Sequence, residues 1–227
     1  MRYISTRDNV IQYSAAQAIT QGLAKDGGLL TPFFIPKLPS KALEDIKDMA
    51  YQQRAVYIMK QYLEEFSVKE LTDFANAAYG PDKFDSPAVA PVRTVDEVTH
   101  CLELWHGPTC AFKDMALQML PHLLSASLVK TEEEKTACIL VATSGDTGKG
   151  ALEGFKNVPR TKILVFYPKD GVSEVQELHP APVDGVGGGE EVAPARQLLA
   201  DRLIREQLFH AGLGIVEVAH HGGDPHI

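Results

Sequence analysis

The stretch that decides the fold is ACILVATSGDTGKG, at residues 137–150. Residues 137–143 form a short, continuous apolar run, as expected for a strand buried in a parallel sheet. Glycines and hydroxyl residues then mark a turn, and residues 148–157 are predicted to be helical. A second apolar run at residues 163–167 predicts the next strand. This pattern indicates a βαβ unit with a right-handed crossover.

The same alternation extends upstream of this stretch. Cys101–Trp105 is a candidate strand, and alanine and leucine recur at helical spacing over residues 116–128. Pro121 lies inside this helical pattern, so we expect the helix to be kinked there or to start late. The chain from residue 101 to 167 therefore predicts a βαβαβ series and an α/β fold.

Residues 1–85 have a different pattern and are expected to be mostly helical. Residues 10–24 carry apolar and small residues at helical spacing. Ser40 is a candidate N-cap for a later helix, and Ser67 with Glu70 fits a capping box. The region is therefore interpreted as a small helical domain that precedes the α/β sheet.

The sheet-type pattern is lost after about residue 178. Residues 172–178 are expected to begin a helix, and a further helix is plausible at residues 194–210. The last residues, 220–227, have a composition typical of disorder. We interpret residues 179–227 as a tail that arises from an unrelated reading frame or a truncated gene.

Composition limits the function classes. The formal net charge of −8 argues against a nucleic-acid or anionic-membrane partner. No apolar run reaches the length of a membrane span or a signal peptide. The three cysteines are widely spaced, which favours neither zinc nor disulfides and indicates a reducing cytoplasm. The histidines of the tail are interpreted as solvated, so no metal site is expected.

A candidate catalytic residue lies in LWHGPTCAFKD, at residues 104–114. The predicted strand ends here, Gly-Pro makes a turn, and Lys113 follows at the start of a helix. A lysine among apolar residues can lose its proton and form a Schiff base with a carbonyl cofactor. Most lysines are instead solvated, and the local pattern leaves both interpretations open.

The loop after the apolar strand is a second candidate site. Backbone N–H groups at the start of a helix favour anions, and Ser144 and Thr147 add hydroxyl donors. The loop could bind a phosphate or a carboxylate, or it could be a plain turn with a capping residue. Thr143 and Gly150 exclude a phosphate-binding loop of the Walker type, and the glycine order excludes a Rossmann fingerprint.

Together these segments resemble the threonine synthase family. HGPTCAFKD at residues 106–114 matches the family's HGPTxAFKD motif, and TSGDTG at 143–148 is present unchanged. Further similarity, in the family's order, is found in YISTR at 3–7, GLAKDGGLL at 22–30, YPK at 167–169 and VQEL at 175–178. The resemblance covers about residues 1–178.

The resemblance implies a pyridoxal 5'-phosphate (PLP) enzyme of fold type II, with a tryptophan synthase β-like sheet. Lys113 would bind PLP and move protons. Ser144, Gly145, Asp146 and Thr147 would lie near the cofactor, and Ser144, Asp146 and Thr147 near the substrate carboxylate. The family converts O-phospho-L-homoserine and water into L-threonine and phosphate, in threonine biosynthesis.

The implied domains are an N-terminal domain at residues 1–85, a partial PLP-binding α/β domain at 86–178, and the tail at 179–227. The family's later loop for the cofactor phosphate has no matching segment, so activity is expected to be impaired. One alternative is another lyase of this fold, such as a dehydratase, although these carry asparagine at the position of Asp146. The other is an inactive remnant that acts at most as a binding module. The sequence does not indicate the oligomeric state.

Overall fold

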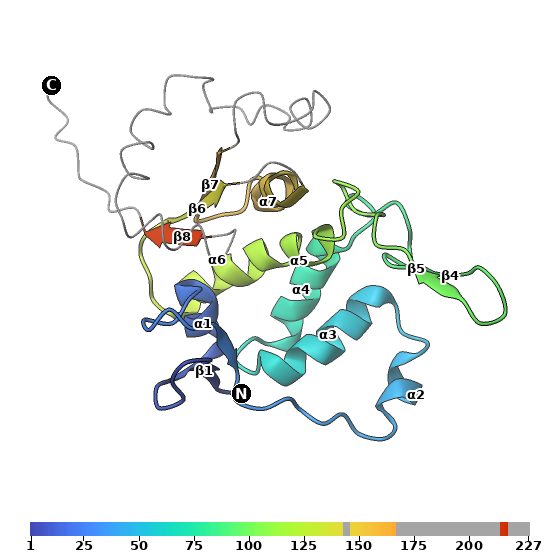
Figure 1. Ribbon diagram of the computed structural model, residues 1–227, viewed down its shortest axis with the longest axis horizontal. Helices are drawn as coiled ribbons and strands as arrows, with labels where there is room; N and C mark the ends of the chain where they lie inside the picture. The colour runs from blue at the N-terminus through green and yellow to red at the C-terminus, as the bar shows by residue number, and fades with distance from the viewer. Residues whose placement is uncertain (143–145, 167–213, 218–227) are drawn as a thin grey trace, which may run out of the picture. The chain divides into compact units, whose positions relative to one another are not determined.

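The computed structural model describes residues 1–142, 146–166 and 214–217 of the chain (Figure 1). By its internal contacts the chain divides into two compact units, Met1–Glu133 and Glu134–Ile227. Lys113 belongs to the first unit, and the two described residues of the candidate loop, Asp146 and Thr147, belong to the second.

A small antiparallel sheet opens the first unit. The central strand β1 (Tyr3–Ser5) pairs with β2 (Gln12–Tyr13) on one side and with β3 (Leu30–Pro32) on the other. The helical pattern of residues 1–85 does not predict these strands, because strands of two or three residues are too short to show alternation. Pro32 lies on an edge strand, where proline is tolerated.

A tight turn at Asp26-Gly27-Gly28 is tied to β1. The Asp26 carboxylate accepts hydrogen bonds from the Ser5 hydroxyl and from the Gly28 N–H, each at 2.8 Å. Gly27 has a φ of 76°, in the left-handed region that glycine adopts without strain. These bonds lower the pKa of Asp26 below its usual value, chiefly through the Gly28 N–H.

The first unit contains six helices. In chain order they are α1 (Ala15–Gln21), α2 (Ala42–Ile46), α3 (Tyr51–Tyr62), α4 (Val68–Ala78), α5 (Asp114–Leu117) and α6 (Leu120–Lys130). The predicted capping box opens α4, because the Ser67 hydroxyl accepts the Glu70 N–H and the Glu70 carboxylate accepts the Ser67 N–H. The predicted late start after α5 is also confirmed, since Pro121 lies in the first turn of α6.

The predicted N-cap at Ser40 is wrong. The residue before α2 is Lys41, which makes no side-chain capping bond. The chain enters this helix through a turn in which the Pro39 carbonyl accepts the Ala42 N–H at 2.9 Å. This backbone bond supplies a partner at the start of the helix, so no side-chain cap is used there.

A hydrophobic core holds these helices together. α1 packs on α6, and α3 packs on α4. Phe66, Leu71 and Ala75 are fully buried in this core, and Met119 joins them just before α6. Because α6 packs against N-terminal helices, the first compact unit extends well past residue 85. The expected domain limits at residues 85 and 178 stay a prediction.

A short ribbon separates α4 from α5. β4 (Val92–Thr94) pairs antiparallel with β5 (His100–Leu102), and all residues of both strands are exposed. The ribbon is a sheet of its own (Figure 1). The prediction that Cys101–Trp105 opens a βαβαβ series is therefore wrong. The reason is local: Asp96 Oδ1 accepts the N–H groups of Val98 and Thr99, which turns the chain back on itself.

The second unit contains the predicted βαβ element. β6 (Ala137–Ala142) and β7 (Thr161–Phe166) pair in parallel, and α7 (Asp146–Phe155) connects them and packs on both. Ile139 and Val141 are fully buried, as expected for the apolar run. An additional strand, β8 (Gly214–Glu217), pairs antiparallel with β6, so the described sheet is mixed, in the order β7-β6-β8.

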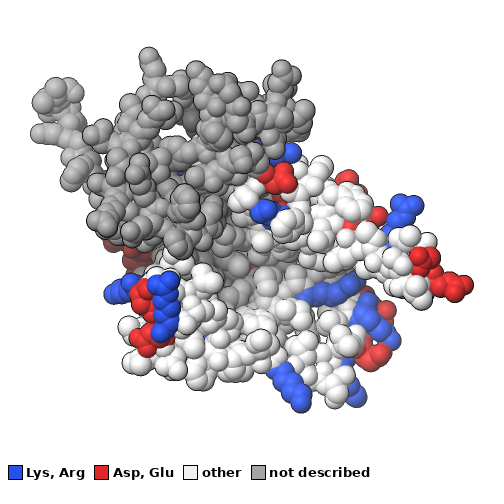
Figure 2. Space-filling model, viewed as in Figure 1, with Lys and Arg blue, Asp and Glu red and all other residues white. Residues whose placement is uncertain are grey.

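β8 was not expected, because it lies inside the tail that has no sheet-type pattern. The helices predicted at residues 172–178 and 194–210 lie outside the described residues. No helix in the described part of the chain is long and apolar enough to cross a bilayer. Figure 2 shows basic and acidic side chains close to one another in small groups on the face that it draws.

Candidate active site

Lys113 is the residue that directly precedes α5. Its carbonyl accepts the N–H groups of Ala116 and Leu117, at 3.1 and 2.9 Å, so the backbone is fixed by the first turn of the helix. The side chain is half-buried, and Nζ lies 4.4 Å from the centroid of the Phe112 ring. Within the described residues, Nζ makes no ion pair. The position of Nζ over the Phe112 ring is that of a cation–π contact.

The turn before Lys113 is held by the next residue, Asp114. Its carboxylate is completely buried and accepts two hydrogen bonds from Thr109, one from the N–H and one from the hydroxyl, each at 2.8 Å. A buried carboxylate needs such partners, because removal from water without them is costly. Both oxygens of Asp114 are therefore committed to Thr109 rather than to the amine of Lys113.

Gly107 allows this turn to close. A Cβ atom built on Gly107 would lie 2.6 Å from the Cβ of Asp114, which is closer than real contacts allow. Cys110 has a φ of 57° and donates its N–H to the Gly107 carbonyl at 3.1 Å. The residues of the HGPTxAFKD motif thus form a compact turn in which glycine, threonine and aspartate are each required for a stated physical reason.

His106, at the entry to the turn, is bonded through both ring nitrogens. Nδ1 lies 2.6 Å from Asp85 Oδ1, and Nε2 lies 2.8 Å from Glu103 Oε2. The carboxylates raise the pKa of His106 above its usual value, Glu103 most strongly and then Asp85. Sequence reasoning missed this cluster, because nothing in the local spacing links Asp85 to a histidine so far along the chain.

The sequence analysis also missed the roles of Thr109 and Asp114, although both lie in the quoted motif. An acidic residue in the first turn of a helix is a common partner for free N–H groups. That pattern was available from the sequence at Asp114. What the sequence could not give is that the partner is Thr109 in the preceding turn, because this depends on how the loop folds back.

The second half of the predicted site is described only in part. Asp146 is exposed in the first turn of α7, and Thr147 follows it half-buried. Ser144 and Gly145 lie outside the described residues. Gly148 and Gly150 are buried in the helix, where their lack of a side chain suits close packing. An acidic residue in the first turn also stabilises the helix dipole, so the position of Asp146 has a structural explanation of its own.

The two halves of the predicted site lie in different compact units. Each is described within its own unit, so the expectation that Lys113 faces residues 144–147 stays a prediction. No cluster of His, Cys, Asp and Glu in the described ranges could hold a metal ion.

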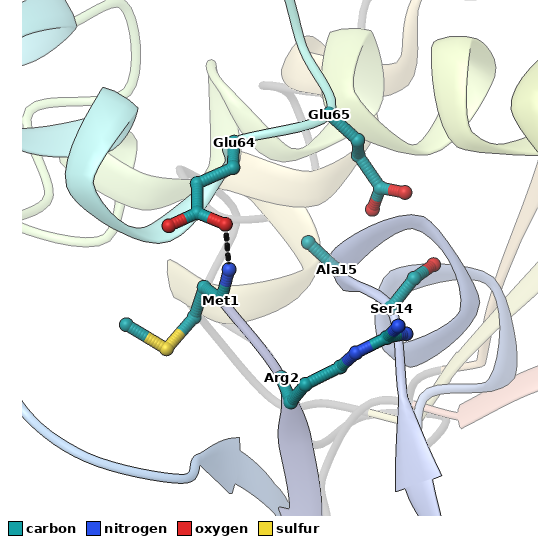
Figure 3. A pocket seen from close by; sticks show the side chains of 6 residues that line it. All are labelled: Met1, Arg2, Ser14, Ala15, Glu64 and Glu65. Atoms are coloured by element: carbon teal, nitrogen blue, oxygen red, sulfur yellow. Dashed lines mark hydrogen bonds and ion pairs between the residues drawn. The ribbon is translucent and has the colours of Figure 1, made fainter.

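A pocket elsewhere in the first unit contains none of the predicted site residues. Its lining is formed by Met1, Arg2, Ser14, Ala15, Glu64 and Glu65 (Figure 3). The Glu64 carboxylate is paired with the amino group of Met1, and the Glu65 carboxylate accepts the N–H of Ala16. Both acids therefore already have partners, and these bonds join the chain start and α1 to the segment after α3.

Comparison with known proteins gives the same assignment as the motifs. Residues 2–79 match the family model for the threonine synthase N terminus. Threonine synthase of Schizosaccharomyces pombe is 37% identical over 189 residues, which cover 80% of this chain and 36% of that protein. The chain belongs to the threonine synthase family. A continuous stretch that covers 80% of the chain has to include its middle, so this threonine synthase match spans Lys113 and residues 144–147.

Other threonine synthases give a similar result. The Escherichia coli threonine synthase is 33% identical over 182 residues, which cover 78% of this chain and 39% of that protein. The crystal structure of PLP-bound threonine synthase from Brucella melitensis matches with a TM-score of 0.72 and 34% identity, over 78% of this chain and 37% of that one. The chain thus spans a little over a third of the length of these relatives.

Proposed function

We propose that this chain carries the lysine-bearing part of a PLP-dependent threonine synthase, a lyase of amino-acid biosynthesis that acts in the cytoplasm. The observation that carries the proposal is the turn formed by residues 106–114. In this turn the half-buried Lys113 directly precedes Asp114, which is buried and hydrogen-bonded to Thr109, in a chain of the threonine synthase family.

The described residues around Lys113 fit a cofactor that binds covalently to an amine. Asp114 is adjacent in sequence, but its carboxylate is used by Thr109, so it does not compete for the amine. The Phe112 ring lies beside Nζ and offers an apolar flank. PLP, when bound, supplies an electron sink that stabilises a carbanion. The role proposed for Lys113 is to hold PLP and then to carry protons to and from the substrate carbon atoms.

The proposed substrate is O-phospho-L-homoserine, which would react with water to give L-threonine and phosphate. Asp146 and Thr147, with Ser144 and Gly145, are proposed to lie beside the cofactor, and Ser144, Asp146 and Thr147 to bind the substrate carboxylate. The position of Asp146 and Thr147 in the first turn of α7 supports this proposal, because a helix N-terminus favours anions. The assignment of Asp146 itself rests on the family motif alone.

Cofactor binding can be tested by visible absorbance. The purified full chain mixed with PLP should develop an absorbance band that is absent in Lys113→Ala, because condensation of the Lys113 amine with the PLP aldehyde shifts the absorbance of the cofactor. Lys156→Ala, at an exposed lysine after α7, is the matched control and should behave like the unmodified chain. A band of equal strength in Lys113→Ala, or no band in the unmodified chain, would contradict the proposal.

The reaction itself requires a second assay. Phosphate released from O-phospho-L-homoserine by the PLP-loaded chain would support synthase chemistry. Colour without phosphate release would show that the chain binds PLP but lacks this activity.

A further inference from the structure

His106 has an unusual environment for a histidine in a loop. Both ring nitrogens face carboxylates, Glu103 at 2.8 Å and Asp85 at 2.6 Å. The side chains of His106 and Glu103 are only 17% and 14% exposed, whereas that of Asp85 is 78% exposed. A neutral imidazole has one N–H and can donate to only one of these acids, whereas an imidazolium donates to both. The geometry therefore selects the protonated ring.

The same residues join two segments that the ribbon β4–β5 separates. Besides the bond between side chains, the Asp85 N–H donates to the His106 carbonyl at 3.1 Å. The Trp105 ring stacks on the imidazole, with centroids 5.7 Å apart and the planes 26° from parallel. These contacts close the base of the ribbon. The next residue is Gly107, whose position against Asp114 fixes the turn before Lys113.

We propose that His106 is a positioning residue: its protonated ring, bonded to Asp85 and Glu103, fixes the entry of the Gly107–Asp114 turn and thereby sets the orientation of Lys113. The titratable groups that face the ring are Asp85 and Glu103. Loss of the proton removes one of the two charge-assisted bonds and leaves a ring lone pair against a carboxylate. The turn is then less restrained, and cofactor attachment at Lys113 becomes weaker.

The pH window follows from the direction of the His106 pKa. Its pKa in the folded chain is raised above the usual 6.5, chiefly by Glu103 and then by Asp85. A group of this kind contributes fully below its unfolded pKa and loses its contribution as the pH rises through its folded pKa. The clamp formed by Asp85, Glu103 and His106 should therefore be closed near pH 6 and should open at a pH above about 6.5.

This inference rests on the proposed attachment of PLP to Lys113, and its test separates the two. PLP affinity of the full chain is measured from pH 6 to 9 for the unmodified protein and for His106→Gln. At pH values below the pKa of His106, the His106→Gln variant should bind PLP at least about fivefold more weakly than the unmodified protein. This is a common size for coupling between sites. The ratio of the two affinities should approach one at high pH. A residue that acts only by packing would give a loss that does not change with pH.

His100→Gln is the matched control, because this histidine is exposed on β5 and bonds Thr94 within the same ribbon. It should leave PLP affinity unchanged at every pH. A ratio for His106→Gln that is constant with pH, or an equal effect of His100→Gln, would overturn the inference while PLP binding itself still stands.

A readout that does not need the cofactor covers the case in which the chain fails to bind PLP. The His106 ring is titrated by NMR, and its signal is assigned by its loss in His106→Gln. Its pKa should lie above 6.5 and should fall in both Asp85→Asn and Glu103→Gln, most strongly in the latter. The Cys110 N–H, which bonds the Gly107 carbonyl, should exchange faster in both variants. An unshifted pKa, or unchanged exchange in these variants, would overturn the clamp.

Discussion

At the scale of single residues, the turn before Lys113 depends on a carboxylate that has no contact with water. Asp114 is fully buried, and both of its oxygens bond Thr109. A partner lost from a buried charged group leaves the cost of its desolvation uncompensated. The same pair keeps Asp114 away from the amine that precedes it, so stability and the chemistry proposed for Lys113 depend on one contact.

The first prediction concerns Thr109. Thr109→Val preserves the shape of the side chain but removes the hydroxyl that donates to Asp114, so the free energy of unfolding should fall by about 1–3 kcal/mol. Urea denaturation followed by circular dichroism measures the change. Thr109→Ser retains the hydroxyl and should lose much less. Equal stability of the valine variant and the unmodified chain would show that Asp114 finds another partner.

At the scale of elements, the sequence patterns correctly predicted those helices and strands that depend on interactions between residues close together in the chain. The capping box at Ser67 and Glu70, the late start of α6 near Pro121, and the β6–α7–β7 series were all predicted, because each depends on neighbours along the chain. The strand expected at Cys101–Trp105 is present in part as β5, but the Asp96 turn pairs it with β4 in a separate sheet, so its expected place in the βαβαβ series was wrong. The His106 cluster could not be predicted, since it requires the fold to bring Asp85 beside it.

The capping box gives a second prediction. Ser67→Ala removes the hydroxyl that accepts the Glu70 N–H, so α4 should lose about 0.5–2 kcal/mol of stability. Thr72→Ala is the control on the same helix, because its hydroxyl bonds only the Val68 carbonyl at an exposed site and should matter less. Thermal unfolding of the two variants compares them directly. A larger loss at Thr72 would contradict this account of the helix start.

A third prediction concerns the contact between α4 and α6. Lys130 Nζ lies 2.8 Å from Glu70 Oε1 and also lies over the Phe66 ring. Lys130 and the Ser67 N–H lower the pKa of Glu70 from 4.5 to about 2. A lowered pKa gives stability that is present above the unfolded value and is lost as the pH falls through the folded value.

The stability of the chain should therefore decline between about pH 4.5 and pH 2 in part through Glu70. Unfolding free energies measured over this range should fall less steeply in Glu70→Gln than in the unmodified chain. Because this side chain is partly exposed, the difference should shrink at high salt. Identical pH profiles for the two proteins would show that the ion pair between Glu70 and Lys130 does not contribute to the free energy of unfolding.

At the scale of the whole molecule, the proposed function requires two compact units to cooperate. Lys113 lies in Met1–Glu133, and the start of α7 lies in Glu134–Ile227. The chain covers only 36% of the length of the Schizosaccharomyces pombe threonine synthase that it matches. The first requirement for cofactor attachment is that the turn at residues 106–114 presents the reactive amine of Lys113.

Identification of the modified lysine tests that claim most directly. The full chain is incubated with PLP, the bond is fixed with borohydride, and the digested peptides are examined by mass spectrometry. The account predicts that the label is concentrated on Lys113. Label spread evenly over exposed lysines such as Lys25 and Lys156, with Lys113 unmodified, would contradict it.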